Sequence, residues 1–193
     1  MRKWIHALLF GVATAISSGF AQAQGAEAEI KAPPVARQTH LAFGGELSSL
    51  GNDFGLGLRL TSPYLGDTFA LRLQGGLHWK EGLLPDTRES TWQSFGDIRL
   101  GIVSVAGELG HTGRVYSEGG AILLIPSDGL GSELGFGGYG VLGIEFYGGP
   151  RWPISYFIEA GGVGSSGRAS GLEGEPSFAN GFIMQVGLHW YPY

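Results

Sequence analysis

Polar and apolar side chains alternate in the segment TFALRLQGGLHW, Thr68 to Trp79. Arg72, Gln74 and His78 occupy one set of alternate positions, and leucines and aromatic residues occupy the other. Successive side chains of a strand point to opposite faces, so this strand has a polar and an apolar face. The same sorting in other segments gathers these charges on the polar face: Glu46, Arg59, Arg72, Asp97, Arg99, Glu118, Glu145 and Glu159.

Guanidinium and carboxylate groups that are enclosed together can form an ion path, a proton relay or a network that fills the interior. A charge buried without a partner costs several kcal/mol, so enclosed groups of opposite sign are expected to pair. A barrel of eight strands has an interior just wide enough for side chains or one small ligand. These constraints favour a structural network that plugs the interior, with a narrow pore or a small-ligand carrier as alternatives.

The composition of the polar face indicates which side of the sheet meets water. Beyond the first two dozen residues the only lysines are Lys31 and Lys80, and neither belongs to that face. The face instead combines arginine, glutamate, many glycines and single aromatic residues, which suits a narrow lumen. We therefore expect the leucines to face lipid, where a charge at mid-membrane costs ~2–4 kcal/mol.

Segments with period-two alternation continue from His40 to the end of the chain, separated by turn-rich breaks. No segment has a convincing helical period, and no stretch after the first two dozen residues has ~18 consecutive apolar residues. We predict an all-β fold, an eight-stranded antiparallel up-and-down transmembrane β-barrel. Its strands are expected at residues 40–48, 54–62, 68–79, 94–105, 114–126, 132–147, 154–163 and 178–193.

The chain is expected to have three parts. Arg2 and Lys3, an apolar run and the small residues Ala21–Ala23 predict a cleaved signal peptide over residues 1–23. Residues 24–39 read as a flexible periplasmic lead-in, and residues 40–193 as the barrel. Cysteine is absent and the net charge is −5, so neither disulfides nor nucleic acid is expected.

Two breaks are long and polar, Lys80 to Gln93 and Gly164 to Ser177, and we expect both at the outer end. Arg88, Trp92 and Arg168 within them are the predicted loop contacts, and Trp92 could stack on a sugar. Their composition names no extracellular partner. Trp79 and Trp190 are expected in an aromatic girdle at the membrane interface.

The chain ends in FIMQVGLHWYPY, an alternating strand with the terminal aromatic residue Tyr193. With the strand count and alternation, this ending resembles the small eight-stranded outer-membrane barrels of the OmpA transmembrane-domain and OmpX/Ail type. The resemblance spans residues 40–193. It implies insertion into the outer membrane, contact with its lipid and lipopolysaccharide, and recognition of the last strand by the barrel-assembly machinery.

Some barrels of this architecture trim lipid A, and PISYFIEAGGVGSS, Pro153 to Ser166, looks loosely like a late strand of the 3-O-deacylases. Such chemistry needs a serine, a histidine and an acid near lipid. The family's His-x-Ser arrangement is missing beside Ser165 and Ser166, and His40, His78 and His189 fall on the lumen face. The enzyme therefore stays an alternative, with no catalytic residue assigned.

The glycine-rich motif GFGGYG, Gly135 to Gly140, matches a dinucleotide fingerprint in letters only. That fingerprint requires a helix after the last glycine, and here the strand pattern continues through Val141 to Phe146. The histidines are single and cysteines are absent, so the sequence predicts neither a metal site nor a cofactor.

Overall fold

The computed structural model describes residues 40–66, 68–110, 112–148 and 153–192. The predicted signal peptide (1–23), the lead-in (24–39) and Tyr193 lie outside these ranges. Among the described residues, no helix has the length and apolar character needed to cross a membrane.

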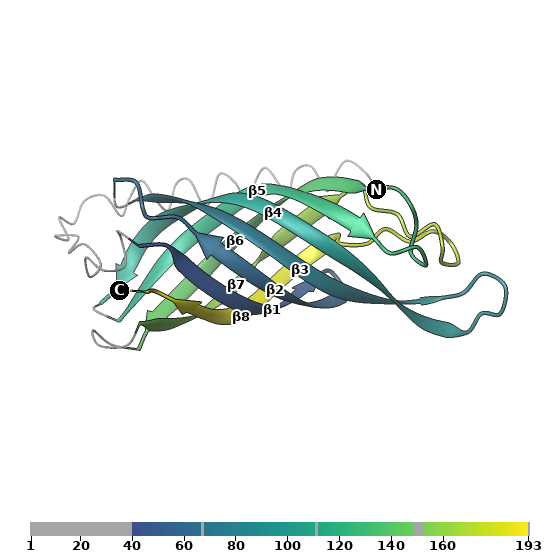
Figure 1. The fold of residues 1–193 in the computed structure, drawn as a ribbon, viewed down its shortest axis with the longest axis horizontal. Helices are drawn as coiled ribbons and strands as arrows, with labels where there is room; N and C mark the ends of the chain where they lie inside the picture. Colours follow the sequence, from purple (N-terminus) through teal and green to yellow (C-terminus); the bar gives the residue numbers. More distant parts are fainter. Residues whose placement is uncertain (1–39, 67, 111, 149–152, 193) are drawn as a thin grey trace, which may run out of the picture. The chain divides into compact units, whose positions relative to one another are not determined.

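The described part of the chain forms a closed antiparallel barrel of eight strands in sequence order (Figure 1). Its strands are β1 (Ala42–Leu50), β2 (Asp53–Thr61), β3 (Phe69–Leu83), β4 (Ser90–Leu109), β5 (Gly113–Pro126), β6 (Gly135–Tyr147), β7 (Ile154–Ser165) and β8 (Gly181–Trp190). The pairing of β1 with β8, with Phe43 opposite Trp190, closes the barrel and leaves no open edge along its wall. The predicted all-β, eight-stranded, up-and-down architecture is confirmed.

Strands β3 and β4 are longer than the alternation predicts. Lys80–Leu83 pairs with Ser90–Gln93, so the two strands continue beyond the wall as a ribbon with a short turn at its tip. The ribbon is visible at the right of Figure 1. The predicted loop from Lys80 to Gln93 is therefore too long, because both of its ends belong to strands. Each of the ribbon's cross-strand pairs contains at least one polar residue, and no apolar alternation runs along it, which explains why the sequence pattern missed it.

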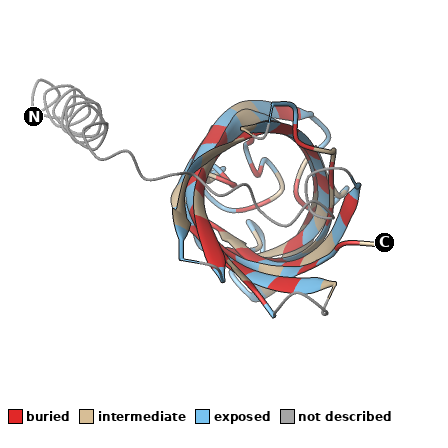
Figure 2. Cartoon of the chain, turned by 90° about the vertical axis from the view of Figure 1, so that its left-hand side faces the viewer, coloured by how far each residue is buried: buried red, intermediate tan, exposed pale blue. Residues whose placement is uncertain are grey.

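Buried and exposed residues alternate along the strands, as the coloured bands in Figure 2 show. Of the charged residues within the eight strands, only Glu81 is exposed, and it belongs to the ribbon. Leu71, Leu73 and Leu100 face outward and are about half exposed. The wall is thus apolar outside and polar inside, the reverse of a soluble barrel.

Glycine allows large side chains to lie flat inside the barrel. The ring of Tyr116 lies against Gly143 on the neighbouring strand, and the ring of Phe157 lies against Gly187. A Cβ atom at either glycine would overlap the ring. Inward glycines such as these two therefore have a packing reason, since eight strands leave little room for side chains.

Candidate functional site

The interior is filled in three layers. The barrel end where β1 starts and β8 ends, here called the terminal end, holds an aromatic layer. The middle holds a charged layer. The opposite end, called the loop end, holds an apolar layer.

The charged layer is centred on Arg59, which touches carboxylates from two strands. It donates to Glu46 on β1, and both of its terminal nitrogens lie 2.9 Å from Glu159 on β7. Its guanidinium also lies 3.9 Å from the ring centre of Phe157, a cation–π distance. Bidentate pairing of this kind satisfies both charge and hydrogen-bond geometry in a buried site.

Two further arginines extend the layer. Arg72 donates to Glu118 at 2.6 Å and to Glu159 at 3.0 Å, and Arg99 donates to Asp97 at 2.7 Å and to Glu46 at 2.5 Å. The side chains of these ion pairs have no solvent exposure. The carboxylates also accept hydrogen bonds from Tyr116, Tyr139, Gln74 and Gln185.

A separate charged pair lies in the terminal-end layer, where Arg114 contacts Glu145 at 2.6 Å. Glu145 also accepts from Tyr191 at 2.5 Å. Burial raises the pKa of the Tyr191 phenol, so it remains a proton donor at neutral pH. The ring of Tyr64 lies 4.6 Å from the Arg114 guanidinium, and burial raises its pKa too. Arginine, glutamate and tyrosine together fill this end of the barrel.

The structure places inside the barrel all eight charged residues that the sequence assigns to the polar face. Seven of them (Glu46, Arg59, Arg72, Asp97, Arg99, Glu118 and Glu159) form one connected set of ion pairs. Glu145 pairs instead with Arg114, which the sequence selection omitted. Arg114 is the second residue of β5 and has the same alternation phase as Tyr116 and Glu118, and that phase is the signal by which it could have been found.

The selected loop contacts are exposed but not all in loops. Trp92 lies in the β4 part of the ribbon and is 61% exposed. Arg88 lies at the ribbon tip, 3.5 Å from Glu173, and Arg168 lies in the segment between β7 and β8. His40 is exposed just before β1, so its expected place in the lumen is wrong.

The segment between β7 and β8, residues 166–180, folds over the barrel mouth, and we call it the stopper loop. Its Ala169, Leu172 and Phe178 are buried among apolar residues of the wall. The ring centre of Phe178 lies 4.8 Å from that of Phe95. Asp53 fixes the loop by accepting the backbone N–H of Ala179 at 3.0 Å while pairing with Lys80 at 3.1 Å. This loop is therefore much less available for outside contacts than its polar composition predicts.

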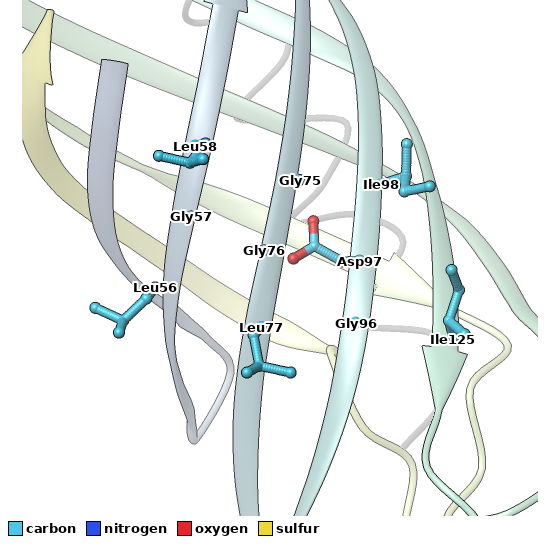
Figure 3. A pocket seen from close by; sticks show the side chains of 10 residues that line it. All are labelled: Leu56, Gly57, Leu58, Gly75, Gly76, Leu77, Gly96, Asp97, Ile98 and Ile125. Atoms are coloured by element: carbon cyan, nitrogen blue, oxygen red, sulfur yellow. The ribbon is translucent and has the colours of Figure 1, made fainter.

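The outer wall offers hollows but little chemistry. Figure 3 shows Leu58, Leu77 and Ile98 projecting around a hollow over Gly75 and Gly96. Asp97 also borders this hollow, but its carboxylate is buried and paired with Arg99. No group of three or more potential metal ligands occurs among the described residues.

No protein-family model matches the chain, and no curated protein matches it in sequence. The barrel's own geometry must therefore indicate what it does.

Proposed function

We propose that the protein is an outer-membrane barrel with a solid, non-conducting interior, of the OmpA transmembrane-domain and OmpX/Ail type. It stabilises the envelope and presents the ribbon and the exposed side of the stopper loop to the outside. The observation that carries this proposal is the inverted polarity of the wall, with paired charges inside and leucines outside. Both arrangements would destabilise a barrel that is surrounded by water.

Aromatic residues on the outer wall support the membrane assignment. Phe54 stacks on Trp79 at 6.4 Å near the loop end, and Phe43 lies 6.0 Å from Trp190 near the terminal end. Phe69 and Trp79 stand at opposite ends of the apolar stretch of β3. At ~3.3 Å per residue and a tilt of about 40°, that stretch covers about 25 Å of barrel axis. This height matches the apolar band of outer-membrane barrels.

The buried network supports a structural role over a pore. Charged, aromatic and apolar side chains fill successive levels of the interior, and the stopper loop covers the loop end. Outer-membrane lipid and lipopolysaccharide are the proposed surroundings, and β8 is the proposed signal for the assembly machinery. Arg88, Trp92 and Arg168 remain the proposed contacts with lipopolysaccharide or an outside partner.

The proposal is tested by envelope fractionation followed by a gel with and without boiling. We expect the protein in the outer-membrane fraction, with a band that shifts on boiling because a closed barrel resists detergent until heated. Recovery in the soluble periplasm would reject the proposal.

A further inference from the structure

On the side of the charged layer that faces the loop end, several polar atoms have no hydrogen-bond partner although their residues are almost completely buried. They are Ser48 Oγ, His78 Nδ1, Arg99 Nη1 and Gln185 Oε1, and we call these four residues the polar floor. Arg72 Nη2 and Gln74 Oε1 in the charged layer, and Tyr64 Oη and His189 Nε2 nearer the terminal end, also have no partner. The hydroxyls of Thr61, Ser155 and Tyr116 are hydrogen-bonded. A buried polar atom without a protein partner is destabilising, so a ligand group that hydrogen-bonds to the floor would be favoured there.

The members of the polar floor lie together. Ser48 is the cross-strand partner of Gln185, and on its other side it pairs with Gly55. The imidazole of His78 lies against Gly55, with Nδ1 nearest to where a Cβ would stand. Arg99 and Gln185 both donate to Glu46. The four unpartnered atoms of the polar floor thus lie on the side of the interior formed by β8 and β1–β4.

An apolar cup lies directly beyond the polar floor. Its wall residues are Leu50, Phe95, Ile122, Leu124, Val141, Val163 and Ile183. Phe95 connects the two regions, because its ring stacks on His78 at 5.1 Å and touches Phe178 of the stopper loop at 4.8 Å. In this structure the stopper loop fills the cup with its own Leu172 and Phe178.

The stopper loop holds its position under strain. Among the described residues, three non-glycine residues have positive φ, and two of them, Glu175 and Ala179, are in this loop. Such conformations are strained and often occur at ligand clamps and switches. Opening the loop would relieve this strain and empty the apolar cup.

We propose that the cup and the floor form a binding site for a neutral, single-chain amphiphile, with the stopper loop as its lid. The acyl chain takes the place of Leu172 and Phe178 in the apolar cup, and an ester or hydroxyl head bonds to the polar floor. The acids beside the floor are already paired: Glu46 with Arg59 and Arg99, and Asp97 with Arg99. Neither sign of charge is left over for an ionic head, so the head is uncharged.

The test uses a monoacylglycerol with a diazirine in its acyl chain, added to the full barrel in phosphatidylcholine liposomes and irradiated. Strand β5 supplies an internal control, because Ile122 and Leu124 face the cup whereas Ile125 faces outward. We expect cross-links at Ile122 and Leu124 in addition to the background at Ile125. Cross-links confined to outward residues would overturn the proposal.

Variants sharpen the test. Ser48→Ala should lower the ratio of inward to outward cross-links about five-fold, since one hydrogen bond to the head is lost. Ser49→Ala is the matched control, because Ser49 follows on the same strand and bonds to Gly51 instead. Phe178→Ala, which empties part of the cup without touching the floor, should raise the ratio. An unchanged ratio in both Ser48→Ala and Phe178→Ala would also reject the site.

Separate measurements test the proposed binding site and the proposed membrane location, so either proposal can be rejected without the other. Flotation of the liposomes before irradiation scores insertion into the bilayer. A barrel that floats but is labelled only on its outward residues loses the binding site and keeps the membrane assignment. A barrel that binds the probe inside but does not float keeps the site and loses the membrane assignment.

Discussion

Arg72 on β3 and Glu118 on β5 meet inside the barrel at 2.6 Å, and neither side chain has any contact with solvent. Their strands are not neighbours, because β4 lies between them. The pair therefore connects two non-adjacent strands through the interior, across the inner face of β4. Glu159 on β7 joins the same guanidinium from a third strand, so one residue holds three parts of the barrel together.

Replacing Arg72 by alanine should destabilise the barrel by about 3–5 kcal/mol, because Glu118 and Glu159 would keep buried charges with fewer partners. Urea unfolding in liposomes, followed by the gel shift on boiling, measures this loss. Arg88→Ala is the control, since Arg88 is an exposed arginine at the ribbon tip and its removal should leave the midpoint unchanged. Equal midpoints for both variants would show that the buried network does not stabilise the fold.

Gly143→Ala should cost about 1–3 kcal/mol through overpacking, because the added methyl group would overlap the ring of Tyr116. Gly140→Ala on the same strand is the matched control. It faces outward, and its nearest neighbour would be 3.9 Å from the new Cβ. The same unfolding assay compares the two, and a Gly143→Ala protein as stable as the control would disprove the packing role of this glycine.

Asp53→Ala should loosen the stopper loop while the barrel stays closed, since the Ala179 N–H and Lys80 both lose a partner. We expect glutamyl endopeptidase to cut at Glu173 or Glu175 about ten-fold faster, because cleavage follows the population of the open loop. Asp128→Ala, at an exposed site near the same end, should cleave like the unaltered protein. Equal rates for both variants would mean that Asp53 does not fasten the loop.

The barrel should not conduct ions. Buried side chains occupy the charged layer, and the stopper loop closes one end, so no continuous water path is expected. Planar bilayers that contain the purified protein should show no discrete current steps at physiological salt. Reproducible steps that disappear on heat denaturation would assign a pore to this interior.

The sequence predicted the wall well because alternation is a local property. Residues such as Leu73 and Gln74 reveal their faces from their neighbours alone, and all eight strands were located in this way. The ribbon was missed because Lys80, Glu81 and Gly82 carry no apolar alternation. The burial of the stopper loop was missed because Leu172 and Phe178 are isolated within a run rich in glycine, serine and glutamate.

The sequence indicated which charges share a face but not which of them pair. Contacts such as Arg59 with Glu159 depend on the stagger of strands around the closed barrel, and a single strand does not encode that stagger. The partnerless state of Ser48 likewise arises only when β1, β8 and β2 are brought together. Sequence reasoning therefore yields the composition of the interior, while the closed structure yields its connections.

The most direct test of the central claim asks which solvent surrounds the outward leucines. The chain has no cysteine, so nitroxide labels can be placed singly at Leu58, Leu100 or Leu142, each more than half exposed on the wall. In liposomes we predict strong relaxation of each label by dissolved oxygen and weak relaxation by a water-soluble nickel chelate. Labels at these positions that are relaxed chiefly by the nickel chelate would show that water, not lipid, covers the wall, and would contradict the account.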